Sequence, residues 1–221
     1  DKNLREQMQY EIKHIHDRIG ITVVYVTHDQ SEALTMSNRI AVFNDGVVQQ
    51  LSTPDILYEK PENSFVAKFI GENNTLNGVV KEINGSSCVV YLDNNQGTVK
   101  ALKINVNWVG EKTQLSIRPE RVSINDGNNE ENSFTGKIEE LIYLGDHIRC
   151  RMTVAGNDDF IVKVPNTADQ LGLQIGAESY VGWQTDDCRA LDVKDAWLFS
   201  EWIIFVLWDE WGRRGGAENW I

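Results

Sequence analysis

The sequence predicts a small α/β part followed by an all-β domain that forms an OB-like barrel. One observation is an unbroken apolar strand at 21–26, which directly follows the pattern of an amphipathic helix. The other is a series of short segments of alternating polarity, separated by polar turns, between residues 74 and 195. We therefore expect three regions, 1–73, 74–195 and a tail of different character at 196–221.

The charge balance narrows the possible partners. The 221 residues include 33 Asp and Glu against 21 Lys and Arg, which gives a formal net charge of −12. The longest basic clusters are pairs, such as Arg213 and Arg214, so nucleic acid is disfavoured as a partner. Three scattered cysteines suit neither a disulfide framework nor a zinc site and favour a reducing compartment. The most apolar run, 202–208, is far shorter than the roughly 20 residues of a membrane span.

The first element is predicted to be a helix from Leu4 to Ile19. Its apolar residues recur at steps of four and three, and Gly20 follows as a stop signal. His14 and His16 lie two residues apart, so they cannot share one helix face. We expect both histidines on the solvent side.

The strand at 21–26 is rich in β-branched residues and shows no alternation, which is typical of a strand buried on both faces of a parallel sheet. Its nearby candidate neighbours are 39–44 and 46–51. We expect that the sheet lacks earlier strands and that the chain is the C-terminal piece of a longer one. With strand faces uncovered, the N-terminal part is expected to be loose or to aggregate, whereas the β-rich region folds by itself.

The segment after the strand carries clear start and turn signals. Asp29, followed three residues later by Glu32, resembles a capping box with an acid at the cap. Asp45–Gly46 predicts a tight hairpin turn between two strands. Thr53 and Pro54 predict the start of a short helix, with Thr53 as cap and Pro54 at the first helical position.

Two stretches interrupt the rest of the chain. The polar segment 125–133 reads as an internal linker that divides the β-rich region into two modules. The last 25 residues hold five of the seven tryptophans, without a clean apolar face and with few basic residues. A helix on a membrane surface is one interpretation. We favour the other, that this tail is not an evolved part of the domain.

His28 lies at the end of the apolar strand, where open α/β sheets bind ligands. An imidazole there can donate to a phosphate oxygen and help to hold an attacking water in line. The plainer alternative is that Thr27, His28 and Asp29 only end the strand and cap the helix. From position alone we favour that alternative, because the chain contains no glycine-rich phosphate loop.

A resemblance to a known family favours the phosphate-contacting interpretation of His28. The segment from Val23 to Asn74 combines a buried strand, Thr-His-Asp-Gln, Glu-Ala, a Ser-Thr-Pro turn and Phe-Ile-Gly-Glu, and it resembles the end of the nucleotide-binding subunit of ABC importers. The resemblance runs from Asp1 to about Asp195. The strings at 115–122, 143–152 and 181–192 resemble those of the TOBE regulatory module, and they look most like those of spermidine/putrescine importers. Iron, sulfate, thiamine and sugar importers share this architecture.

The resemblance implies roles for two residues. His28 is expected to be the switch histidine that contacts the γ-phosphate of ATP, and Asp1 is expected to end the D-loop at the nucleotide-dimer interface. Residues 1–73 would then be the C-terminal part of a P-loop ATPase core. The Walker A loop, Q-loop, signature motif and Walker B strand are absent from the chain, so we expect no cofactor-binding or metal-binding residues in it and no turnover by the chain alone.

The resemblance also implies the setting of the parent protein. It would bind ATP and Mg²⁺, pair with a second copy of itself, and energise a membrane permease supplied by a solute-binding protein. Its place would be the cytoplasmic face of the membrane, as a peripheral subunit, and its solute a polyamine.

A different class of function is a freestanding OB-like module that binds a small ligand or an oligonucleotide. Asp146, Asp158 and Asp159 are candidates for a site that senses a cationic polyamine. Solvated turn acids are the plainer interpretation of these three residues.

Overall fold

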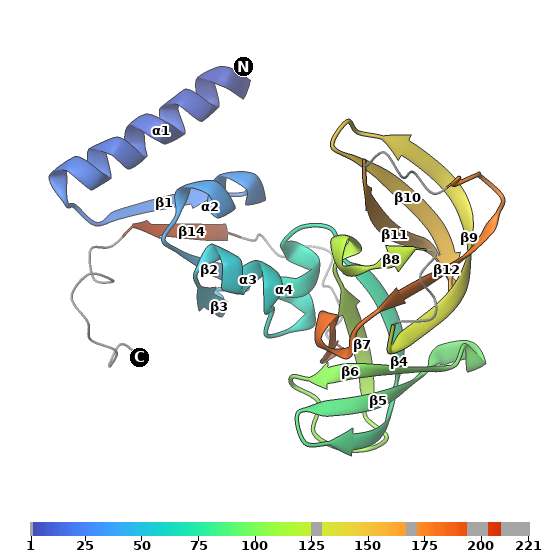
Figure 1. Cartoon of the computed structure of the whole chain (residues 1–221). Coiled ribbons are helices and arrows are strands. Elements are labelled where there is room, and N and C mark those ends of the chain that lie inside the picture. Colours follow the sequence, from blue (N-terminus) through green and yellow to red (C-terminus); the bar gives the residue numbers. More distant parts are fainter. Residues whose placement is uncertain (1, 125–129, 167–171, 194–202, 209–221) are drawn as a thin grey trace. The chain divides into compact units, whose positions relative to one another are not determined.

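The computed structural model describes residues 2–124, 130–166, 172–193 and 203–208. These residues form two compact units, one that ends at Gly71 and includes 203–208, and one that begins at Glu72 (Figure 1). The first unit mixes helices with strands, and the second contains a closed β-barrel. The predicted fold class is confirmed.

The first unit contains a four-stranded sheet in the order β1-β14-β2-β3. Its elements are α1 (Lys2–Ile19), β1 (Val23–Thr27), α2 (Gln30–Met36), β2 (Arg39–Asn44), β3 (Val47–Ser52), α3 (Pro54–Glu59), α4 (Ser64–Phe69) and β14 (Ile203–Trp208). Strand β14 lies between β1 and β2 and runs antiparallel to both (Figure 1). A segment of the region that the sequence sets apart as a tail thus supplies a central strand of this sheet.

The predicted hairpin turn and the start of α3 are confirmed, although the Thr53 side chain makes no capping hydrogen bond. Asp45 and Gly46 have φ angles of 50° and 73°, as a two-residue hairpin turn of type I′ requires between β2 and β3. Pro54 occupies the start of α3, and Asn63 caps α4 by accepting a hydrogen bond from the Val66 amide at 2.9 Å. The caps fix where the short helices begin. Those helices bury Leu57 and Val66 in the core of this unit, and Ile70, directly after α4, is buried with them.

One expectation about burial is met and one is wrong. Strand β1 leaves one face uncovered, as expected for a sheet that lacks earlier strands, since Val24 and Val26 are 55% and 50% exposed. The described part of the chain does not cover that face, so the β-branched pattern does not lead to full burial. In α1, His14 is exposed as expected, but His16 is buried at 5% while Met8 of the apolar stripe is 58% exposed. Of the apolar stripe, Ile12 packs against the core of this unit, whereas Met8, Ile15 and Ile19 are exposed.

The second unit consists of a closed barrel and a five-stranded sheet. The barrel has the order β13-β6-β5-β4-β7, and the sheet the order β11-β10-β9-β12-β8. The barrel strands are β4 (Asn74–Asn84), β5 (Ser87–Leu92), β6 (Thr98–Lys103), β7 (Lys112–Ile117) and β13 (Cys188–Leu191). The sheet strands are β8 (Ser123–Ile124), β9 (Asn132–Tyr143), β10 (His147–Val154), β11 (Asn157–Pro165) and β12 (Glu178–Trp183). Three 3₁₀ turns connect them, η1 (Asp93–Asn95), η2 (Pro119–Arg121) and η3 (Thr185–Asp187).

One core serves both parts of the second unit. A single apolar cluster includes Leu115 and Ile117 from the barrel together with Phe160 and Trp183 from the sheet, all fully buried. The Phe160 and Trp183 rings pack with their centroids 5.8 Å apart. A cluster of this size excludes water from both β layers at once. The predicted linker at 125–133 therefore does not separate two independent modules: β9 begins within it, and both sides share a core.

Candidate functional site

The turn that carries His28 is held by hydrogen bonds of its neighbours. Strand β1 ends at Thr27, His28 is exposed, and α2 begins at Gln30. The Asp29 amide donates to the Thr27 hydroxyl at 2.9 Å, which closes the turn around His28. Asp29 also caps α2, because its carboxylate accepts from the amides of Ser31 and Glu32 at 2.8 and 3.2 Å. His28 is thus presented from a fixed backbone at the carboxyl end of a strand.

Glu32 is the residue that sequence reasoning missed. The capping-box pattern predicts that its side chain reaches back to the cap. Instead its carboxylate accepts hydrogen bonds from the hydroxyls of Thr27 at 2.6 Å and Tyr25 at 3.2 Å. Glu32 is only 8% exposed, so these bonds offset the cost of removing a carboxylate from water. A Tyr two residues before the Thr was the only available signal, since strand residues two apart point to one face.

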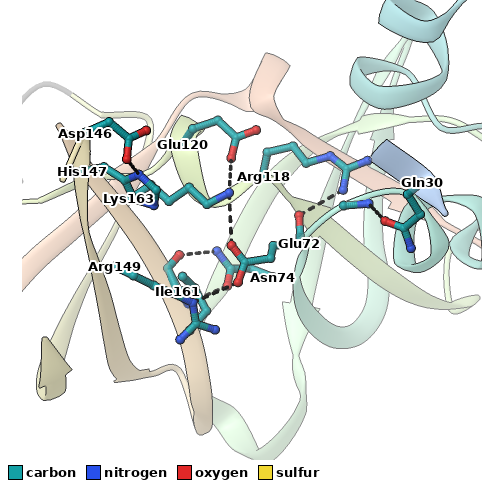
Figure 2. Close-up of polar contacts among 11 residues, drawn as sticks. Gln30, Glu72, Asn74, Arg118, Glu120, Asp146, His147, Arg149, Ile161 and Lys163 are labelled. Atoms are coloured by element: carbon teal, nitrogen blue, oxygen red, sulfur yellow. Dashed lines mark hydrogen bonds and ion pairs between the residues drawn. The ribbon is translucent and has the colours of Figure 1, made fainter. Parts of the chain in front are cut away.

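The same turn is tied to the end of the first unit. Gln30 accepts a hydrogen bond from the Gly71 amide at 2.9 Å through its side-chain oxygen (Figure 2). Gly71 follows α4 with a φ angle of 73°, a conformation that favours glycine. A Cβ at this position would lie 2.7 Å from Cε2 of Tyr58, so packing also demands glycine.

Glu72 opens the second unit and lies among basic side chains. Its carboxylate accepts from Nε of Arg149 at 2.9 Å and lies 3.1 Å from Nζ of Lys163 (Figure 2). Arg118, itself 5% exposed, donates to the Glu72 carbonyl at 3.0 Å. Partial burial acts to raise the pKa of Glu72, but the hydrogen bonds from Arg149 and Lys163 outweigh it and hold the pKa below its usual value.

The three acids considered as a polyamine site do not form one. Asp146 precedes β10, whose first residue pairs with the last residue of β11, while Asp158 and Asp159 lie near the start of β11. At about 3.3 Å per residue, the two ends of this strand pair are roughly 20 Å apart. Asp146 instead lies 2.9 Å from Nδ1 of His147, and this contact lowers the pKa of its carboxyl. That hypothesis is wrong.

The second unit does contain a hollow of another composition. It has a volume of about 610 Å³ and opens between the barrel strands and the turn that precedes β13. Its polar lining includes Ser87, Lys100, Glu131, Thr185 and Asp186. The Thr185 amide donates to the Glu131 carboxylate at 2.9 Å, and hydrogen bonds to Thr185 lower the pKa of Glu131. Sequence reasoning did not single out these residues, because they come from four separate strands and turns.

The remaining expectations concern phosphate and metal. Asp1 lies outside the described residues. Within the described ranges no group of three or more His, Cys, Asp or Glu side chains could hold a metal ion. The sequence contains no glycine-rich phosphate loop.

The chain is similar to a known domain family and to known proteins. Residues 115–191 match the model of the TOBE domain. Over 198 residues the chain is 38% identical to the spermidine/putrescine import ATP-binding protein PotA of Trichodesmium erythraeum, which covers 86% of this chain and 52% of that protein. Over 150 residues it is 44% identical to PotA of Pseudomonas aeruginosa strain UCBPP-PA14, covering 66% of this chain and 41% of that protein.

The chain thus spans about half the length of the curated relatives that it matches. Among solved structures, the cytoplasmic molybdate-binding protein ModG with molybdate bound aligns with a TM-score of 0.46 and 16% identity, over 54% of this chain and 96% of that one. No helix in the described ranges is both long and apolar enough to cross a membrane.

Proposed function

We propose that this chain serves as the C-terminal half of an ATP-hydrolysing importer subunit. Its homology to the C-terminal portion of spermidine/putrescine import ATP-binding proteins and its TOBE domain support this proposal. In this function the first unit contributes the switch histidine, and the second unit is a regulatory and dimerisation domain. The solute is a small cation of the polyamine class, as the names of the relatives indicate.

The observation that carries the proposal is the geometry of the His28 turn. His28 is exposed at the carboxyl end of β1, and Thr27, Asp29 and Glu32 fix the backbone on both sides of it. A turn that is held this way presents an imidazole in one place, which a contact to the γ-phosphate of ATP requires. Bound ATP and Mg²⁺ would supply the reacting phosphoryl group, and this chain's share is to position one hydrogen-bonding group beside it.

The other parts of the machinery would come from elsewhere. The segment of a relative that precedes the matched region is expected to supply the phosphate loop and the catalytic carboxylate. Partners of the complete subunit would be a second copy of it, at an interface that includes Asp1, and a membrane permease served by a solute-binding protein. Its place would be the cytoplasmic face of the membrane, as a peripheral subunit.

One observation favours a second candidate, a freestanding module that binds a small ligand without ATPase activity. This is the polar hollow of about 610 Å³ in the second unit, a size that small-molecule sites commonly have. An oligonucleotide is a poor ligand for this module, because the chain carries a formal net charge of −12.

A chimaera tests the leading proposal. The part of the T. erythraeum relative that precedes the matched region is joined ahead of Asp1, and steady-state ATP hydrolysis is compared with that of the 221-residue chain. We expect the chimaera to hydrolyse ATP and the chain alone to show no hydrolysis and no heat of ATP binding in calorimetry. A soluble, folded chimaera without ATPase activity would contradict the proposal and leave the freestanding module as the better candidate.

A further inference from the structure

We propose that β14 acts as a plug. It fills a slot, one strand wide, between β1 and β2, and in a complete ATPase subunit this slot would receive the strand that carries the phosphate loop. The identity of the incoming strand rests on the proposed function, whereas the slot is a feature of the first unit alone. The partner is thus a strand from the segment that precedes the matched region in the relatives, and β14 must leave before that strand can enter.

The slot follows from the directions of the strands. Strand β14 is antiparallel to β1 and also antiparallel to β2, so β1 and β2 run parallel to each other (Figure 1). They lie two strand positions apart, because β14 is hydrogen-bonded to both. The connection between them contains α2, and a helical crossover is the usual way to join parallel strands. The segment β1–α2–β2 is therefore a parallel unit that skips one place in its sheet.

The strand that fills this place comes from the far end of the chain. Residues 204–207 of β14 pair on both sides, with residues 24–27 of β1 and with residues 39–42 of β2. Helix α2 lies close to β14 as well as to β1, so a helix covers the slot on one face. In sheets that are covered by crossover helices, the interior strands are as a rule parallel, and an antiparallel strand usually lies at an edge. The central, antiparallel position of β14 is what a substitute strand would have.

Strand β14 also runs the wrong way to bring a loop to His28. Thr27, the last residue of β1, pairs with Ile204 near the beginning of β14. A phosphate loop follows the carboxyl end of its strand and leads into a helix. A strand that delivers such a loop beside His28 must therefore run parallel to β1 and end next to Thr27. A parallel strand in the slot meets this requirement, and β14 does not.

The slot suits an incoming strand better than the outer edge of β1 does. Neighbouring strands lie about 4.8 Å apart, so either place would bring the loop close to His28. In the slot, a strand has hydrogen-bonding partners along both of its edges, from β1 and from β2. At the outer edge it would have partners from β1 alone. The place with more backbone hydrogen bonds is thus the one that β14 occupies, and the two strands compete for it.

Amide hydrogen exchange in the 221-residue chain and in the chimaera tests the plug. In the 221-residue chain the amides of residues 204–207 should be protected, because this stretch is paired on both sides. In the chimaera we expect these amides to exchange about 100-fold faster or more, since a displaced strand loses the protection of a central position, while the β1 amides stay protected. If residues 204–207 remain as protected in the chimaera as in the chain alone, the plug is wrong.

Phe205→Pro, made in both proteins, provides a second measurement. In the 221-residue chain it should speed exchange in β1, because a proline breaks the ladder that β14 forms. In the chimaera it should leave exchange in β1 unchanged, because another strand then fills the slot. Equal acceleration in the two proteins would overturn the proposal. Exchange in β5 of the barrel is the internal control and should be the same in all four proteins.

A chimaera that folds poorly also gives an answer. Protection of β1 that is absent in the chimaera and is restored by Phe205→Pro would show that β14 obstructs the incoming strand, as the plug requires. Absence of β1 protection in both forms of the chimaera would overturn the proposal, because the slot would then accept no strand from the relative.

Failure of the plug and failure of the proposed function are distinguishable. The exchange experiment contains no nucleotide, so release of β14 supports the plug even if the chimaera shows no ATP hydrolysis. If the chimaera hydrolyses ATP while residues 204–207 stay protected, the proposed function stands and the plug is wrong.

Discussion

Glu32 and its two hydroxyl partners hold the His28 turn at the level of single residues. Glu32→Ala removes the acceptor of the buried Thr27 hydroxyl and one partner of the half-buried Tyr25 hydroxyl. We expect a loss of about 1–3 kcal/mol in the free energy of unfolding of the first unit, and a smaller loss for Glu32→Gln, which keeps an oxygen acceptor. Urea titration measures both. Glu11→Ala, at an exposed position of α1, is the control, and an equal effect of Glu11→Ala and Glu32→Ala would refute this role.

Gly71 and Gly46 form a matched pair for separating backbone strain from packing. Both have a φ angle of 73°, but a Cβ at Gly46 meets nothing within 4 Å, whereas one at Gly71 meets the Tyr58 ring. Gly46→Ala should cost about 1–2 kcal/mol, the strain of a left-handed residue. Gly71→Ala should cost more, because the ring must also move. Thermal unfolding of the two variants compares them directly, and equal losses would show that the ring yields without cost.

The lowered pKa of Glu72 predicts that the stability of the second unit depends on pH. Its pKa in the folded protein lies below the usual value of 4.5, so the unfolded chain binds the proton more tightly. Its contribution to stability is therefore complete above the usual pKa and is lost as the pH falls through the lower folded value. The difference in free energy of unfolding between the wild type and Glu72→Gln should be constant above about pH 6 and should shrink in the acid range. A difference that grows on acidification would contradict the ion-pair account.

Single residues also show how far the sequence can be read. The position of His28, the Asp29 cap and the Asp45–Gly46 turn follow from local chemistry, which acts over a few residues and leaves a pattern. The hydrogen bonds of Glu32 could not be predicted, because its partners depend on which side chains the strand turns toward the helix. The contacts of Glu72 were even harder to predict, since its partner Arg149 lies 77 positions later in the chain.

The strand β14 poses the main question at the level of elements. The sequence favours a tail that is not part of the domain, yet β14 pairs with β1 through residues 204–208 and with β2 through residues 203–207. Phe205 pairs with Val26 on one side and Ala41 on the other. Phe205→Pro should break this ladder, because proline has no amide hydrogen and is not tolerated in a central strand.

The expected result of Phe205→Pro is faster amide exchange in β1 and β2, with exchange in the barrel strands unchanged. Unchanged exchange in β1 would mean that β14 does not hold the sheet together and would support the sequence-based view of the tail. Such a strand is hard to predict, because pairing between residues about 180 apart leaves no periodicity that a local pattern can register.

Neighbouring elements also explain the exposure of β1 and α1. A run of β-branched residues predicts a strand, but whether both faces are covered depends on what other elements reach it. Val24 and Val26 are exposed because the described chain offers no layer on that side. The same holds for α1, whose apolar stripe predicts a buried face and whose Met8 is nevertheless exposed.

At the scale of the whole molecule, each unit has a different part in the proposed function. The first presents His28, and the second carries the TOBE domain, the single large core and the ion pairs around Glu72. The fold class of both units was predictable, because alternating polarity and apolar runs in the sequence indicate which faces of strands and helices are covered. The shared core of barrel and sheet was not, since it depends on how β11 and β12 return to strands that come earlier in the chain.

The most direct test of the account is ATP hydrolysis by the chimaera with His28→Ala, measured beside His14→Ala as a control on an exposed histidine of α1. We expect His28→Ala to lower the turnover rate by about 100-fold or more, as loss of one group that stabilises the reacting phosphate does, and His14→Ala to retain the full rate. Equal rates in the two variants would show that His28 is only a strand-ending residue, and the proposed role of this chain in ATP hydrolysis would fall with it.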